Sequence, residues 1–444
     1  MVTELAKPQN NYQSAFQSMR KAKPSVAWVE LVRESAMDRF EVLGYPTVKD
    51  EEWKYTNLAS AAKENFLPLA VRADLTVEDA NRFSYPETAA SHVVLVNGEF
   101  RPELSQTNDL GDVVVLDLFN ATTDARYSKI VRDDLARSAT YHDQGLTALN
   151  TAFLQSGLFV LIPKNVALKT PLQITYITDT GASSQMTLPR VLVVAEENSS
   201  AKLIESFVAR GEQSYFTNSV VEVVLKDGAR LQHVRLQREG RNAIHVGTTS
   251  AELGRGSSYN STAINLGAKL ARHDVSVVMD HEGSECWVDG LYVVGPDQHS
   301  DTHSLIDHKV PYCNSHQLYK GILDGNGRAV FNGKVFVREG AQKTDALQTN
   351  KNLLLSPQAR VDTKPQLEIY ADDVKCAHGA AVGQLDQDEL FYLQARGINP
   401  DLGKSLLTYG FAEEVIGKIE IESIRKELDE AVMNQLHARL EVQG

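Results

Sequence analysis

A cysteine and a histidine stand two residues apart near the end of the chain, at Cys376 and His378. Side chains two positions apart on an extended strand point to the same face, so this thiolate and imidazole would lie side by side. Both groups ligate metals, but a zinc site or a thiolate-rich cluster prefers four ligands. The pair is therefore either structural or half of a metal site that another chain completes.

A second cysteine–histidine pair has C-x-x-H spacing, at Cys313 and His316. A closed zinc site needs two further ligands, so packed or solvated histidines are the simpler interpretation. The third cysteine, Cys286, precedes a tryptophan in a strand-like stretch and is expected to be a buried, inert thiol. Four of the chain's 12 histidines lie in this region: His299, His303, His308 and His316. The sequence assigns no role to the first three.

Several enzyme signatures do not occur in the chain. Residues 327–334 resemble a phosphate-binding loop, but five residues separate Gly327 from Gly333 and Val335 replaces the Ser or Thr. Neither H-E-x-x-H nor G-x-S-x-G is present, and no carboxylate pair stands out. The sequence thus predicts no nucleotide site and no catalytic centre of its own.

Composition narrows the class of protein. The chain has 444 residues and a net charge of −13, which makes nucleic acid and anionic membranes poor partners. Three cysteines exclude a disulfide scaffold. No apolar run reaches the length of a membrane span, and the N-terminus lacks a secretory signal. We therefore expect a cytoplasmic protein.

The chain divides into three parts by pattern: a mixed, helix-first region 1–154, a β-rich region 155–385 and a helical region 386–444. In the last region, Asn399-Pro400 predicts a helix start and Gly410 its end. A further helical stripe begins at Ile421. These helices could pack on a core, cap the end of the β region or present a face to a partner.

Turn-plus-strand units recur in the β region at intervals of 28, 28, 27, 44 and 31 residues, beginning at positions 200, 228, 256, 283, 327 and 358. Such a period favours a parallel β-helix, with an antiparallel sandwich as the alternative. The interval of 44 leaves room for an extra strand at residues 316–323. The β-helix predicts burial of Val223, Leu225 and Leu231.

Five longer motifs stand out in the sequence. They occupy residues 50–58 (DEEWKYTNL), 331–334 (FNGK), 343–346 (KTDA), 368–380 (EIYADDVKCAHGA) and 390–398 (LFYLQARGI). Together they resemble motifs of the SufB/SufD family of iron–sulfur cluster assembly proteins. SufB members place a cysteine in the stretch that matches residues 348–355, where this chain has none, so the resemblance is to the SufD branch.

The resemblance implies a right-handed parallel β-helix with helical domains at both ends. It implies a non-catalytic scaffold in a cytosolic complex with a SufB-like paralogue, bound through the end of the β-helix, and two SufC-like ATPases, bound through the C-terminal helices. A transient iron–sulfur cluster or iron would lie at the subunit interface, with His378 the more important ligand and Cys376 the second. Flavin binding and a homodimer of the isolated chain stay open. The alternative function is a β-helix enzyme acting on polysaccharide, which the fold alone would allow.

Overall fold

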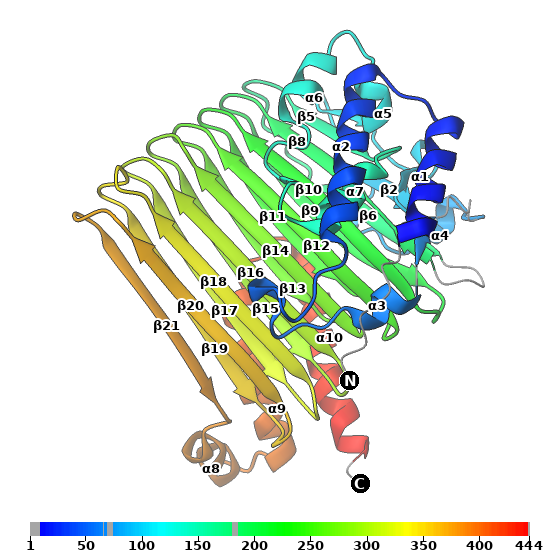
Figure 1. Cartoon of the computed structure of the whole chain (residues 1–444). Coiled ribbons are helices and arrows are strands. Elements are labelled where there is room, and N and C mark those ends of the chain that lie inside the picture. The colour runs from blue at the N-terminus through cyan, green and yellow to red at the C-terminus, as the bar shows by residue number, and fades with distance from the viewer. Residues whose placement is uncertain (1–8, 65, 69–73, 180–184, 443–444) are drawn as a thin grey trace.

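The computed structural model describes residues 9–64, 66–68, 74–179 and 185–442, and its main feature is a pair of long, facing β-sheets (Figure 1). Sheet A contains, in spatial order, β20 (Arg360–Ile369), β18 (Arg328–Val337), β16 (His299–His308), β14 (Leu270–Met279), β12 (Ala243–Leu253), β10 (Tyr215–Leu225), β8 (Arg190–Ala195), β5 (Leu158–Ile162) and β4 (Val114–Asp117), with β7 (Gln185–Thr187) and β1 (Leu67–Pro68) attached beside β10. Sheet B contains β21 (Lys375–Gly383), β19 (Asp345–Leu354), β17 (Asn314–Leu323), β15 (Glu285–Val294), β13 (Ser258–Asn265), β11 (Arg230–Gln237), β9 (Ser200–Arg210), β6 (Leu172–Asp179), β2 (His92–Val96) and β3 (Glu99–Phe100).

The chain alternates between the two sheets, and every pairing between successive coils from β8 and β9 onward is parallel. The parallel β-helix is therefore confirmed, and the antiparallel sandwich is excluded. Two strands per coil, each ten or so residues long, fill an ordinary turn of such a solenoid.

The interval of 44 residues holds the expected extra strand. The strand expected at 316–323 is confirmed as β17, which follows β15 and β16 within this interval, whereas each of the other intervals holds two strands. The turn at position 283 precedes β15 of sheet B and the turn at 327 precedes β18 of sheet A, so the interval runs from one sheet to the other. No coil is longer than the rest, because paired residues in sheet B from β6 onward lie 27 to 31 residues apart, as in Ser258 with Glu285 and Asn314 with Asp345.

The space between the sheets is filled by side chains from both. Val223, Leu225 and Leu231 are at most 2% exposed, as predicted. The interior also contains polar and charged groups: His233 Nε2 lies 2.7 Å from Glu205 Oε2, and both side chains are at most 1% exposed. Interior glycines provide room for long neighbours: a Cβ at Gly321 would lie 2.1 Å from a buried tyrosine ring.

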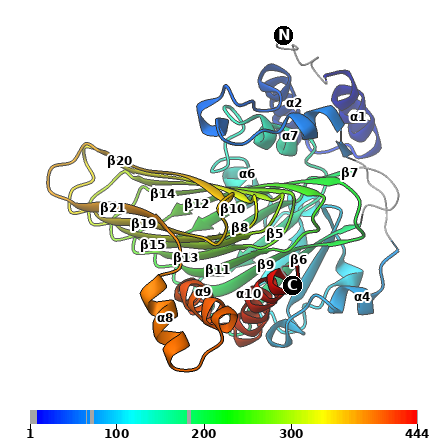
Figure 2. The same ribbon diagram turned by 90° about the horizontal axis from the view of Figure 1, so that it is seen from below.

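Helices and short strands of the N-terminal region cover the first coils and the outer face of sheet A (Figure 2). Helix α2 (Ala27–Leu43) ends at Gly44, which adopts a φ of 63° and donates its amide hydrogen to the carbonyl oxygen of Phe40. Strands β3 and β4 pair antiparallel with β2 and β5. The helical elements are α1 (Gln9–Ala22), α2 (Ala27–Leu43), η1 (Glu51–Trp53), α3 (Ala59–Glu64), α4 (Val77–Asn81), η2 (Pro86–Thr88), η3 (Pro102–Leu104), α5 (Leu118–Ala121), α6 (Ser128–Asp134) and α7 (Gly145–Ala152).

Three C-terminal helices lie along the outer face of sheet B rather than over the end of the solenoid (Figure 2). They are α8 (Gln387–Ala395), α9 (Pro400–Ile416) and α10 (Glu422–Val442). Asn399 caps α9 as predicted, but the helix continues through Gly410, where an end was expected. An exposed glycine costs a helix only about 1 kcal/mol, and burial of Val415 and Ile416 in the following turn offsets that cost.

Candidate functional site

The C-terminal end of the β-helix is open. Strand β21 pairs with β19 on one side, and its other edge has no partner strand within the described residues (Figure 1). Most of its residues are exposed. An edge of this kind offers unpaired backbone groups to another strand.

Cys376 and His378 lie on this terminal strand and share one face. Cys376 pairs with Ala346 and His378 with Gln348, both of which are buried inside the preceding coil. The two side chains thus continue the interior rows of the β-helix past its last closed coil. His378 is exposed, and Cys376 is half-buried against a small apolar cluster that includes Ala371. Burial raises the pKa of the Cys376 thiol, and the charge of Asp345 raises it further. A hydrogen bond with the backbone of Ala346 lowers this pKa in part.

The described part of the chain does not complete a ligand set around this pair. Across that part, no group of three or more His, Cys, Asp or Glu side chains is arranged to hold a metal ion. The ligand roles of Cys376 and His378 therefore stay predictions, and further ligands would have to come from elsewhere.

The C-x-x-H pair is not brought together. The Cys313 thiol is fully buried in the main core and contacts Ser284. His316 lies on β17 and stacks on the ring of Trp287, with 5.6 Å between centroids. Cys286 is fully buried, and burial raises the pKa of its thiol, which fits the expected inert role.

The histidine-rich stretch forms a different contact, because β16 places His299, Asp301 and His303 on the outer face of sheet A. There they meet the segment around η1, which carries the motif of residues 50–58. We call this contact the clasp. Thr56 Oγ1 donates to Asp301 Oδ2 at 2.5 Å, and Arg272 Nη1 donates to the backbone oxygen of Glu52 at 2.7 Å.

Further contacts of the clasp reach the neighbouring strands. The guanidinium of Arg272 lies 3.8 Å from the centre of the Trp53 ring. Asn332 Nδ2 donates to Glu52 Oε2 at 3.1 Å, and Lys364 on β20 pairs with Glu51 at 2.8 Å. Two of the motifs noted in the sequence, residues 50–58 and 331–334, thus meet in space although 280 positions separate Glu52 from Asn332.

Electrostatics at the clasp favour the charged forms. Burial alone would lower the pKa of His303, but the charge of Asp301 and hydrogen bonds to Asp301 and Glu52 raise it to about 9. Burial would raise the pKa of Asp301, yet the charges of Arg272 and His303 hold it well below its usual range. The hydrogen bond from His303 lowers the pKa of Glu52.

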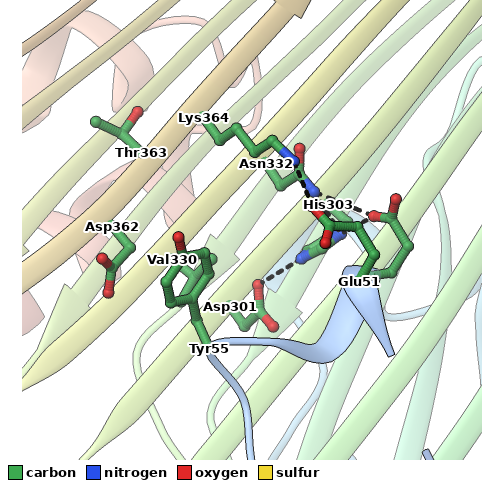
Figure 3. A pocket seen from close by; sticks show the side chains of 10 residues that line it. Glu51, Tyr55, Asp301, His303, Val330, Asn332, Asp362, Thr363 and Lys364 are labelled. Carbon is green, nitrogen blue, oxygen red and sulfur yellow. Dashed lines mark hydrogen bonds and ion pairs between the residues drawn. The ribbon is translucent and has the colours of Figure 1, made fainter. Parts of the chain in front are cut away.

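Two adjoining cavities border the clasp. The smaller, of about 70 Å³, is lined by carboxylates together with His303, Asn332 and Lys364 (Figure 3). The larger, of about 550 Å³, lies between η1, the start of α7 and the outer face of sheet A, and both cavities share Glu52.

The sequence identified individual residues of the clasp but did not predict that they meet. Glu52 and Asn332 belong to noted motifs and His303 to the noted histidine stretch, but nothing local joins them. One signal was present: His299, Asp301 and His303 alternate along a strand-like run, which places them on one face.

A second exposed feature lies on the C-terminal helices. Four apolar side chains there remain on the surface and do not join the core beneath them. They are Phe391 (70% exposed), Tyr392 (57%), Leu402 (46%) and Leu406 (40%).

Comparison with known proteins assigns the family. Residues 176–411 match the model described as "SUF system FeS cluster assembly, SufBD core domain", and residues 6–174 match the "SufBD protein N-terminal region". An iron–sulfur cluster assembly SufBD family protein of Synechocystis sp. is 37% identical over 408 residues, 90% of this chain and 89% of the relative. The iron–sulfur cluster assembly protein SufD of Escherichia coli is 31% identical, covering 87% and 88%, and that of Bacillus subtilis is 27% identical, covering 94% and 96%.

These matches favour the assembly function over the polysaccharide enzyme. Among the described helices, none has the length and apolar character needed to cross a bilayer. The chain belongs to the SufBD family of iron–sulfur cluster assembly proteins.

Proposed function

We propose that the chain is a SufD-type, non-catalytic scaffold subunit of a cytoplasmic iron–sulfur cluster assembly complex. Relatives named SufD cover nearly its whole length. The stretch at 348–355, where SufB proteins place a cysteine, carries the amides Gln348, Asn350 and Asn352 at interior positions, all at most 3% exposed. An interior row of amides offers hydrogen bonds but no thiolate to iron.

The observation that carries the proposal is the position of Cys376 and His378 on one face of the last, uncovered strand. A thiolate and an imidazole can each bind iron in a cluster. Because the described chain supplies only these two, a SufB-like paralogue would supply the rest. The nascent cluster, the cargo of the complex, would then be held between subunits and remain accessible for transfer.

The same strand offers a route for the paralogue to bind. Strand addition at the open edge of β21 would extend sheet B across the interface, with main-chain hydrogen bonds giving affinity. The partner's first coil would then cover His378 and Val382, an apolar residue that is 48% exposed.

ATP hydrolysis would belong to SufC-like ATPases bound at the C-terminal helices. Phe391 and Tyr392 on α8 and Leu402 on α9 are large apolar side chains that stay exposed, and exposed apolar surface often marks a protein contact. Phe391→Asp is expected to abolish ATPase binding without loss of the fold. Leu305→Asp, a change at another exposed leucine on sheet A, is the matched control and is expected to bind normally.

The ligand proposal is tested in the co-expressed complex. His378→Ala should leave the mass of the complex unchanged and abolish cluster formation, measured as bound iron and sulfide, and Cys376→Ala should have an equal or smaller effect. Full cluster assembly by the double variant would refute the ligand roles. Loss of the complex itself would instead assign the pair to packing at the interface.

A further inference from the structure

Three side chains of the clasp face one another at the distances that neighbouring ligands keep around a metal ion. Nδ1 of His303 lies 3.1 Å from Oε2 of Glu52 and 3.4 Å from Nδ2 of Asn332. The Asn332 nitrogen lies 3.1 Å from the same Oε2. Ligands about 2.0–2.2 Å from a first-row metal ion are separated by roughly 3.0–3.5 Å in octahedral or tetrahedral geometry. The triangle of atoms has that size.

The amide of Asn332 has an acceptor without a partner. The residue is only 8% exposed, it lines both cavities, and its buried Oδ1 has no hydrogen-bond partner in the described structure. A half-turn of the amide exchanges Oδ1 with Nδ2. The carbonyl oxygen would then face the Glu52 carboxylate, an arrangement that is repulsive without a cation between them and favourable with one.

The far side of the imidazole faces a buried carboxylate, as it does in many metal sites. Nε2 of His303 lies 3.1 Å from Oδ1 of Asp301, which is 1% exposed. Arg272 Nη1 holds the other oxygen of this carboxylate at 2.7 Å. A carboxylate on the second ring nitrogen orients a metal-binding histidine and fixes the lone pair on the first. Here the first ring nitrogen, Nδ1, faces Glu52, and a metal ion bound there would replace the proton that Nδ1 carries.

We propose that His303, Glu52 and Asn332 bind one divalent first-row transition ion, with Asp301 as the orienting residue. One imidazole with carboxylate and amide oxygens suits ions such as Mn²⁺, Fe²⁺, Co²⁺ or Zn²⁺. The cavity of about 70 Å³ beside them leaves room for several waters as further ligands. The site shares no residue with the open end and does not rest on the proposed function.

The positive groups nearby are already neutralised. Arg272 pairs with Asp301 and with Asp274 at 2.7 Å. Lys334 pairs with a glutamate on β20, and Lys364 pairs with Glu51. An entering cation would therefore replace the proton of His303 as the partner of the Glu52 carboxylate.

The competing interpretation is that the same atoms form only an ion pair that attaches the N-terminal segment. Chelator-treated full-length chain carrying Cys376→Ser and His378→Ala, which removes the other candidate ligands, separates the two. Mn²⁺ is titrated and free ion is measured by electron paramagnetic resonance. We expect one ion per chain, and Glu52→Gln and His303→Gln should each weaken binding at least tenfold.

Matched variants isolate the ligand role. Glu51→Gln neutralises the adjacent carboxylate, which pairs with Lys364, and should change the affinity less than twofold. Asn332→Asp places a charged oxygen at the third position and should tighten binding at least threefold. Equal affinity in the two glutamate variants, weaker binding by Asn332→Asp, or no ion bound at millimolar Mn²⁺ would overturn the proposal. If His303→Gln does not fold, the comparison of Glu52→Gln with Glu51→Gln is sufficient to test the proposal. The Glu52 side chain is 56% exposed and the change to Gln is isosteric, so this variant is expected to fold.

Discussion

His308 should make the stability of the protein fall on mild acidification. It is fully buried at the end of β16, and its Nε2 lies 2.8 Å from the hydroxyl of Ser315. Burial lowers its pKa from 6.5 to about 4, although the charge of Asp307 opposes this. Because the native pKa lies below the unfolded value, the unfolded chain takes up a proton first as the pH falls. Stability from this group is therefore complete above pH 6.5 and is lost as the pH falls toward 4.

The size of the loss follows from the two pKa values. The difference between 6.5 and about 4 corresponds to about 3 kcal/mol when it is fully expressed. About 1.4 kcal/mol should be gone at pH 5.5 and about 2.5 kcal/mol at pH 4.5. Other buried histidines, such as His92, titrate in the same direction, so the whole protein loses more than this.

The contribution of His308 is isolated by comparison with His308→Gln, which keeps a polar side chain beside Ser315. Urea unfolding at four pH values from 7.5 to 4.5 gives the free energy of unfolding of both proteins. The gap between them should shrink by about 2.5 kcal/mol toward pH 4.5. His303→Gln should show the opposite trend. The pKa of His303 is raised to about 9, so its stabilisation is complete below pH 6.5 and falls as the pH rises; the gap between wild type and His303→Gln should therefore widen by about 1.4 kcal/mol from pH 7.5 to pH 4.5. A gap between wild type and His308→Gln that is constant across the range would refute the reasoning.

Three further substitutions test the packing, each by urea unfolding. Leu231→Ala removes a core side chain that is 2% exposed and should cost about 2 to 5 kcal/mol; a loss below 1 kcal/mol would contradict its enclosure. Arg190→Met leaves the buried Glu222 without its charged partner and should cost about 3 to 5 kcal/mol, whereas a neutral effect would show that backbone amides suffice for the glutamate. Gly321→Ala would press a methyl group onto a tyrosine ring and should cost about 1 to 3 kcal/mol, while Gly379→Ala, with no atom within 4 Å, should change little. Equal losses for the two glycines would argue against the packing at position 321.

The coil period and the buried rows could be predicted from sequence because they are local. Each coil contacts mainly its neighbours, so spacing and β-branched runs carry the information. The sheet to which each turn leads could not be predicted. The turn before β15 and the turn before β18 look alike in the sequence, although the strands that follow them belong to opposite sheets. The end of α9 failed for another reason, because burial of Val415 beyond Gly410 is a tertiary effect that outweighs helix propensity.

The site residues also differ in whether local sequence places them. Cys376 and His378 lie two residues apart, and their shared face follows from strand geometry alone. The clasp does not, because Glu52 meets His303 and Asn332 only once a solenoid has stacked β16 and β18 and the N-terminal segment has crossed them. No pattern within a window of ten residues contains that information.

The two ends of the β-helix differ, and the difference argues for where a partner binds. At the N-terminal end, β3 and β4 turn back antiparallel, and helices cover the first coils. At the other end, no described strand turns back on β20 or β21, and the C-terminal helices lie along sheet B instead of over the last coil. A bare edge invites uncontrolled strand pairing, and proteins usually protect it with charges, proline or a covering element. β21 carries Gly379 and Val382 there, with one charged residue, Lys375, at its start, so the paralogue that we propose as partner would supply this protection. Val382→Lys adds a charge at this edge and should therefore reduce assembly with the partner. The thermal unfolding of the isolated chain should stay unchanged, because Val382 is exposed there. Normal assembly of this variant would contradict pairing through β21.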